Sequence, residues 1–265
     1  MTTLLTFIGL IGSTIISLIG YHLKAISFDG IFTTILIGTL ITLSGNLATW
    51  ASIIFLFGSS LIIKLIKSLF FPDSFKIEEK RHEKQGARDS FQIISNTAPA
   101  TLCLILYTYT RDSNFLIAYL SSLAGATADT WGSEIGILST GRTIDLTTLK
   151  ITPKGISGGV SSLGLFASLL GSFSSVTVFL FFNFFQPIPI SRQDVLLIIG
   201  IGFLASLIDS LLGSLFQGIF ETPHHELTEK QKNNHLVRGH KWLNNDGVNF
   251  ITNSISAIIT LLIKI

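Results

Sequence analysis

The chain has 265 residues, of which 48% are hydrophobic and only 13% are charged, with a formal net charge of +2. Soluble domains carry about 25% charged residues, so this composition excludes a disordered chain, a nucleic-acid-binding domain and an ordinary cytosolic enzyme, and indicates a polytopic membrane protein. The single cysteine, Cys103, excludes an intrachain disulfide and a cysteine-based zinc cluster.

Helices long enough to cross a bilayer, roughly 20 apolar residues each, are predicted along the whole chain. The uncharged stretch from Gly30 to Ile63 is too long for one upright span, and Ser44-Gly45-Asn46 supplies a turn signal within it. Dividing it there predicts an all-α bundle of eight spans, at about 3–22, 28–43, 47–69, 92–110, 114–138, 157–184, 194–220 and 247–264. The alternative is one tilted helix over 30–63, which gives seven spans. Either arrangement makes 1–265 a single membrane domain.

The basic residues are distributed very unevenly about the eight-span arrangement. One side receives the connections 70–91, 139–156 and 221–246 and the short 22–28 turn, which leaves Arg111, Arg192 and Lys264 as the basic residues of the other side, 3 of the 18 in the chain. The positive-inside rule therefore places the three long connections in the cytoplasm and both termini outside. Because no Arg-rich, acidic-poor transit segment precedes the first span, we expect a bacterial or archaeal cell membrane.

Several acidic residues occur within or beside the predicted spans, where a charge costs at least ~2.5–3.5 kcal/mol and is a functional candidate. The main candidates are Asp129 and Glu134 near the end of the fifth span, Asp209 in the seventh, and Asp246 at the start of the eighth. All of them approach the membrane from the basic side, as do Asn96 and Asn249. We therefore predict one water-accessible pocket that opens on this side.

Clustered anions repel each other unless a cation neutralises them, so Asp129, Glu134 and Asp209 need a divalent cation, a lysine or an arginine nearby. Oxygen ligands favour Mg²⁺, which commonly binds one or two carboxylates together with substrate phosphates. The alternative is that the polar groups hold helices together, as Asn, Gln, Ser and Thr often do in membranes.

A run rich in glycine and serine, from Thr152 to Gly164, joins the second long connection to the sixth span. Glycines let the backbone approach an anion, and free N–H groups at a helix start favour phosphate. The candidate anion-binding residues are Lys154, Ser157, Gly158, Gly159 and Ser161. A small-residue helix interface explains the run equally well. Beside the carboxylates, however, the run predicts phosphoryl transfer, in which positioning and electrostatics dominate catalysis.

The first and third long connections carry many charges. Residues 76–85 alternate charge sign, which is typical of a solvated helix on the membrane surface. Arg88 and Asp89 adjoin the fourth span and are better candidates for the pocket. The segment 221–245 contains four histidines without HExxH spacing, and we expect a solvated loop there.

Five short blocks in a fixed order resemble a known family. They are Gly86-Ala87-Arg88-Asp89-Ser90, Ala128-Asp129-Thr130-Trp131-Gly132-Ser133-Glu134, Gly155-Ile156-Ser157-Gly158-Gly159, Asp209-Ser210-Leu211-Leu212-Gly213 and Asn244-Asn245-Asp246-Gly247-Val248-Asn249. Over about 79–253 the chain resembles the transmembrane protein 19 family, also called domain-of-unknown-function family 92. Residues 1–70 match in hydrophobic character alone.

The resemblance implies a membrane-embedded kinase, because the best-understood members of the family are phytyl phosphate kinases of tocopherol biosynthesis. The expected reaction transfers a phosphoryl group from a nucleoside triphosphate, CTP by similarity to polyprenol kinases, to a prenyl phosphate, with Mg²⁺ as cofactor. The expected catalytic and metal-binding residues are Asp129, Glu134 and Asp209. The expected substrate- and nucleotide-binding residues are Arg88, Asp89, Asn96, Lys154, Ser157, Gly158, Gly159, Ser161, Asp246 and Asn249.

Two other functions are compatible with the same residues. Intramembrane carboxylates could bind ions or protons in a transporter or a lipid-phosphate flippase, or could be structural in a scaffold. In each case we expect membrane lipid as a partner and no nucleic acid, and a homo-oligomer is possible.

Overall fold

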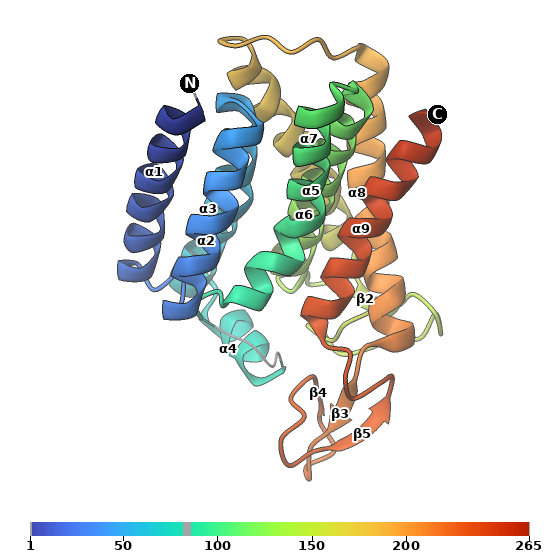
Figure 1. Ribbon diagram of the computed structural model, residues 1–265. Helices are drawn as coiled ribbons and strands as arrows, with labels where there is room; N and C mark the ends of the chain where they lie inside the picture. The colour runs from blue at the N-terminus through green and yellow to red at the C-terminus, as the bar shows by residue number, and fades with distance from the viewer. Residues whose placement is uncertain (1, 82–85, 265) are drawn as a thin grey trace.

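A bundle of eight long helices dominates residues 2–81 and 86–264, the part of the chain that the computed structural model describes (Figure 1). The helices are α1 (Thr2–His22), α2 (Phe28–Ser44), α3 (Leu47–Phe70), α5 (Ser90–Thr110), α6 (Ser113–Gly136), α7 (Ser162–Asn183), α8 (Arg192–Phe216) and α9 (Asn245–Lys264). Five of them, α1, α3, α7, α8 and α9, are long and apolar enough to cross a membrane, and α2 is apolar but only 17 residues long. The predicted all-α membrane bundle is confirmed.

The predicted turn at Ser44-Gly45-Asn46 separates α2 from α3, so the alternative of one tilted helix is wrong. Asn46 caps α3, because its side chain accepts hydrogen bonds from the N–H groups of Ala48 and Thr49. The backbone N–H of Gly45 donates to the carbonyl of Ile41 and closes the last turn of α2.

Helix α6 lies at the centre of the bundle and packs against α3, α5, α7, α8 and α9. Small residues make this possible, since Gly132 faces Ser168 and Gly136 faces Gly164 on α7. A Cβ atom added at Gly132 would come within 2.2 Å of the Ser168 hydroxyl oxygen. The small-residue interpretation therefore holds for this pair of helices.

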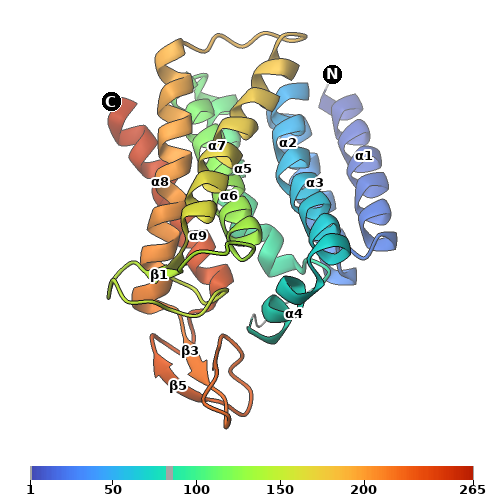
Figure 2. The same ribbon diagram turned by 180° about the vertical axis from the view of Figure 1, so that it is seen from behind.

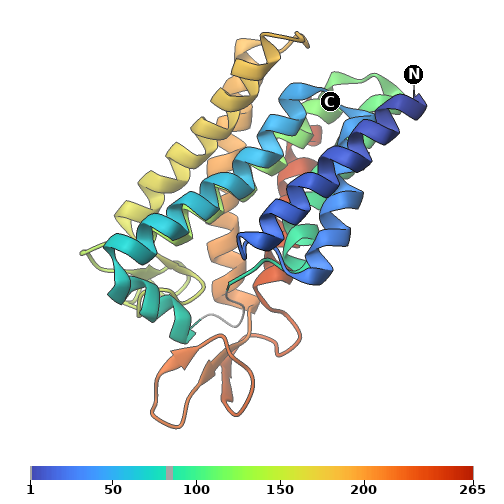
Figure 3. The same cartoon turned by 90° about the vertical axis from the view of Figure 1, so that its left-hand side faces the viewer.

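The helices α1 and α2 form a pair at one edge of the bundle (Figure 3). Helix α2 joins the pair to the rest mainly through α5, whereas α3 packs against α7 and α6.

The three connections that contain α4 and the strands lie at one end of the bundle, and both termini lie at the other (Figures 1 and 2). The first connection contains the predicted surface helix as α4 (Pro72–Arg81), and residues 82–85 of that prediction fall outside the described residues. The even number of long helices in the described chain explains why both termini share one end.

Two small antiparallel sheets in these connections were not predicted. In the first, β1 (Ile144–Asp145) pairs with β2 (Gly159–Val160); the second has the order β4 (Leu227–Thr228), β3 (Ile219–Glu221), β5 (His235–Arg238). The expectation of a loop over 221–245 is therefore wrong in part.

The strands also correct two span boundaries. The sixth span begins at Ser162 rather than 157, because residues 159–160 pair with β1, and Ser161 is its N-cap. The seventh ends at Phe216 rather than 220, because the chain turns into β3.

Candidate functional site

Two carboxyl groups from different helices meet near the end of the bundle that carries the connections. Asp129 of α6 and Asp209 of α8 are hydrogen-bonded to each other through their side chains. The hydroxyl of Thr252, on α9, donates to Asp209 over 3.1 Å. Two carboxyls can stay in contact only with a proton or a cation between them, so three helices converge on a point that demands positive charge.

Further oxygen atoms surround this pair. Glu229, which follows β4, is buried, and its charge acts on Asp209. Asn249 of α9 is 8% exposed, and its Oδ1 atom has no hydrogen-bond partner among the described residues. A buried acceptor without a donor costs free energy and is a typical position for a bound cation or ligand.

Two polar cavities adjoin at the carboxyl pair. The first, of about 80 Å³, extends from Asp129 and Asp209 to the Gly/Ser loop at residues 154–161. The second, of about 140 Å³, extends from Asp129 between α5, α9 and β3. Both cavities are lined by Asp129, Ser133, Glu229 and Asn245. Two ligands, one in each cavity, would therefore meet at Asp129.

Nearly all of the predicted site residues line one of these cavities. The first cavity has Asp129, Asp209, Lys154, Ser157, Gly158, Gly159 and Ser161 on its walls. The second has Asp129, Glu134, Arg88, Asn96, Asp246 and Asn249. Asp89 lines neither cavity within the described chain, and is instead the N-cap of α5, where its side chain accepts from the N–H of Gln92. The structure thus brings the set together, with Asp89 in a capping position.

Glu134 does not join the Asp129–Asp209 pair. Its carboxylate forms an ion pair with Lys67, which is fully buried, and lies 3.5 Å from the ammonium of Lys64. A metal ion bound by Glu134, as predicted, would therefore compete with two lysines for the carboxylate.

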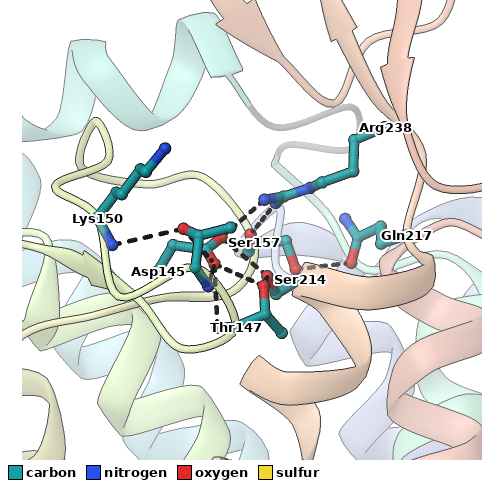
Figure 4. A network of polar contacts seen from close by, with 8 residues as sticks. Asp145, Thr147, Lys150, Ser157, Ser214, Gln217 and Arg238 are labelled. Carbon is teal, nitrogen blue, oxygen red and sulfur yellow. Dashed lines mark hydrogen bonds and ion pairs between the residues drawn. The ribbon is translucent and has the colours of Figure 1, made fainter.

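The Gly/Ser loop is held by a network around Asp145, which sequence reasoning missed (Figure 4). The carboxylate of Asp145 accepts from Thr147, Thr148, Ser214 and Arg238. Arg238 also donates to the carbonyl of Ser157 over 3.0 Å, and the Ser157 hydroxyl donates to Gln217 over 2.8 Å. The loop is thus tied to β5 and to the end of α8.

The hydrogen bonds keep Asp145 ionised. Burial alone would raise the pKa of this carboxyl, but the bonds from Thr148, Thr147, Ser214 and Arg238 outweigh it and hold the pKa well below its usual value. The negative charge in turn fixes Arg238, whose side chain is 31% exposed.

Gly158 allows the loop to touch α8. Its φ of +86° lies in the left-handed region, and a Cβ there would come within 2.4 Å of the Cβ of Ser214. A glycine is therefore required for the closeness of the loop to α8, independently of any phosphate.

Lys154 and Arg81 bind backbone carbonyls beside the first cavity. The Lys154 ammonium donates to the carbonyl of Ser139 beyond the end of α6, and Arg81 of α4 donates to the carbonyl of Lys154. The carbonyl of Arg81 accepts the N–H of Glu229 over 2.8 Å. Arg81 thus joins α4, the loop and β4, and positions Glu229.

Sequence reasoning missed Glu229, Lys64, Lys67, Asp145 and Arg238 as parts of this region. Glu229 and Arg238 lie in the segment interpreted as a solvated loop, and Lys64 and Lys67 counted only as markers of membrane side. The available signal for Lys64 and Lys67 was their position in an apolar helix, because a charge inside the membrane usually faces a partner in the protein interior.

The donor set suits a hard divalent cation. Among the described residues, no three His, Cys, Asp or Glu side chains are placed to hold a metal ion by themselves. Asp129 and Asp209 provide two carboxyls, and the unpartnered Asn249 oxygen lies in the wall of the adjoining cavity. A Mg²⁺ ion held by these two carboxyls would need waters or substrate phosphates to complete its ligands.

Comparison with known proteins connects this arrangement to a family. The family described as "Integral membrane protein DUF92" matches residues 4–257. Protein VTE6, chloroplastic, of Arabidopsis thaliana is 31% identical over 71% of this chain and 50% of its own length, so the chain spans about half of that relative. Protein PGR of the same plant is 27% identical over 94% of this chain and 92% of its own.

An archaeal relative extends the comparison. An uncharacterized membrane protein of Methanocaldococcus jannaschii is 30% identical over 56% of this chain and 61% of its own length. No solved structure matches the chain significantly.

Proposed function

The chain belongs to the DUF92 family of integral membrane proteins, and from this membership and the two adjoining cavities we propose that it is a prenyl-phosphate kinase. It would transfer the terminal phosphoryl group of a nucleoside triphosphate, CTP in the first instance, to an isoprenoid monophosphate such as phytyl phosphate. The proposal extends to this chain the activity that the family resemblance implies.

The observation that carries the proposal is the meeting of two polar cavities at Asp129. A kinase with two anionic substrates needs two polar subsites that share one point, and positive charge at that point. An oxygen of the acceptor phosphate would form a bond to the γ-phosphorus. The bond from that phosphorus to the β–γ bridging oxygen would break, and its electron pair would leave with the nucleoside diphosphate.

Mg²⁺ would be held by Asp129 and Asp209 and would screen the charge of the triphosphate. The acceptor is already a phosphate anion, so no strong general base is required. The protein's own task is to hold two anions in line and to exclude water.

The first cavity, of about 80 Å³, is smaller than the ~300–1,000 Å³ of a whole small-molecule site and suits the phosphate end of the nucleotide. Its wall contains the loop at 154–161, where Lys154 supplies positive charge and the backbone turns at Gly155 and Gly158 with positive φ. Residues on this basic end of the bundle would face the cytoplasm, where nucleotides are available, with the chain in the cell membrane.

A panel assay tests the proposal. Purified protein is incubated with Mg²⁺, each of four nucleoside triphosphates and several prenyl monophosphates, and the prenyl diphosphate is measured. We expect diphosphate with at least one pair, and we expect Asp129→Asn to abolish it while the protein still inserts and folds. Asp112→Asn, at the far end of the same helix, is the matched control, because Asn caps a helix as well as Asp does.

Two outcomes would overturn the proposal. One is normal turnover in Asp129→Asn. The other is accumulation of prenyl phosphate in sealed vesicles without nucleotide, which is the behaviour of a transporter.

A further inference from the structure

A third cavity, apolar and larger than the other two, lies between α1, α2 and α3. Its volume is about 460 Å³, within the ~300–1,000 Å³ typical of small-molecule sites. Apolar side chains such as Ile19, Ile37, Ile53 and Phe57 line it. It occupies the space beside the α1–α2 pair that no further helix in the described chain fills.

The cavity is elongated along α3. Its walls include residues of α3 from Trp50 to Ser68, and the part from Trp50 to Lys64 alone corresponds to about 21 Å at 1.5 Å per residue. Its shape therefore suits an extended hydrocarbon chain.

The apolar cavity ends at two cations that it shares with the second polar cavity. Lys64 and Arg88 line both. The guanidinium of Arg88 donates to the Ser60 hydroxyl over 2.7 Å and lies 4.9 Å from the centre of the Phe57 ring, so packing holds it at the boundary.

Basic and acidic groups meet at this boundary. The carboxylate of Glu134 contacts Lys64 and Lys67, and its charge acts on Arg88. Of these cations, Lys64 and Arg88 line the apolar cavity, where each can bind an anion through a charged hydrogen bond. A ligand with a long apolar tail and a compact anionic head would match this arrangement.

We infer that this cavity binds the acceptor of the proposed kinase: a single-chain isoprenoid monophosphate, with its chain along α3 and its phosphate at Lys64 and Arg88. The inference rests on the proposed function for the direction of transfer, since the second polar cavity leads from these cations to Asp129. With the acceptor phosphate at the second polar cavity, the first cavity is left for the nucleotide.

A monophosphate with one chain fits better than a bilayer phospholipid. The cavity of about 460 Å³ extends along one helix, α3, and its basic wall residues are Lys24, Lys64 and Arg88. A phospholipid would have to place a second acyl chain and a glycerol ester in the same volume.

Photoaffinity labelling tests the assignment without turnover. A prenyl monophosphate with a diazirine at the far end of its chain is bound to the full-length protein in nanodiscs, without nucleotide, and labelled peptides are identified. We expect label on the segments of α2 and α3 near Ile37 and Trp50, competed by phytyl phosphate but not by dioleoyl phosphatidic acid. Equal competition by phosphatidic acid, or label elsewhere in the chain, would overturn the inference.

A cavity-filling variant provides the second test. A Cβ at Gly58, which lines the cavity, would meet nothing within 4 Å, so Gly58→Phe can project into the space without a backbone clash. We expect at least a tenfold loss of prenyl-phosphate affinity. Gly12→Phe and Gly200→Phe are matched controls, since both positions are equally open and lie outside the cavity walls.

The outcomes separate the two proposals. If the cavity is labelled specifically but no nucleotide gives diphosphate, the binding site is supported and the kinase activity is refuted. If diphosphate forms but the label lies elsewhere, or a folded Gly58→Phe protein keeps its affinity for prenyl phosphate, the kinase activity is supported and this binding site is refuted.

Discussion

At the scale of single residues, the site depends on charges that compensate each other inside the bundle. Asp129 and Asp209 need a proton or a cation between them, Glu134 has Lys67 and Lys64, and Asp145 has Arg238. Glu134 and Asp145 thus have cations of their own, whereas the described lysine and arginine side chains form no ion pair with Asp129 or Asp209. In the proposed reaction, the carboxyl pair would therefore be the place where a bound cation supplies positive charge.

Lys64→Gln separates binding of the acceptor from binding of the nucleotide. We expect the KM for prenyl phosphate to rise about tenfold, the effect of losing a charged hydrogen bond of roughly 1.5 kcal/mol. The KM for nucleotide should stay within twofold. Stability should change little, because the Lys64 side chain is 34% exposed and such ion pairs contribute about 0–1 kcal/mol.

Lys76→Gln, on α4 and away from the three cavities, is the control for that variant. Equal rises in both KM values would contradict the placement of the acceptor phosphate at Lys64.

Asp145 predicts a pH dependence of stability. Its pKa is lowered in the folded state, so its contribution is complete above the unfolded value of about 3.9 and is lost as pH falls below it. We expect Asp145→Asn to lower the free energy of unfolding by roughly 2 kcal/mol at pH 7, since it removes charged hydrogen bonds. The difference in free energy of unfolding between variant and parent should shrink as the pH falls below 4. Thermal unfolding at several pH values measures this difference. A difference that is constant with pH would contradict the assignment.

At the scale of elements, hydrophobicity and turn chemistry were sufficient to predict the helices. The break at Gly45-Asn46 and the ends of most spans follow from uncharged length and capping residues. The strands could not be predicted, because β1, β2 and β4 have two residues each and are defined only by their pairing, β1 with β2 and β4 with β3. The same strands decide where α7 begins and α8 ends.

The site was predictable where carboxylates and glycines stood in apolar surroundings, and not where it depends on the connections. Asp129 and Asp209 lie within apolar helices and are conspicuous, whereas Glu229 and Arg238 lie in a charged segment that resembles any solvated loop. They are placed at the site by the sheet β4-β3-β5 and by the contacts of Arg81 with Lys154 and with the N–H of Glu229.

Gly158→Ala tests whether the loop at 154–161 must touch α8. The positive φ and the contact with Ser214 predict displacement of the loop and a cost of roughly 1–3 kcal/mol. We expect the KM for nucleotide to rise about tenfold and that for prenyl phosphate to stay nearly unchanged. Gly141→Ala, in the same connection and with ordinary space around it, should behave as the parent protein. A raised prenyl-phosphate KM would instead assign the loop to the acceptor.

At the scale of the whole molecule, the bundle contains both apolar and polar cavities. An apolar groove between α1, α2 and α3 leads to cations, and these border a polar cavity that meets a second one at Asp129. In the proposed reaction, a lipid-soluble acceptor would remain in hydrocarbon while its phosphate reaches a water-soluble donor. Asp129 of the carboxyl pair lines both polar cavities.

The most direct test of the account follows the γ-phosphate itself. The protein in nanodiscs is supplied with γ-labelled nucleotide, Mg²⁺ and prenyl monophosphate, and the label is traced. The account predicts label in the terminal phosphate of a prenyl diphosphate, and no such product from Asp129→Asn. Label that appears only as inorganic phosphate, or prenyl diphosphate formed equally by the variant, would contradict it.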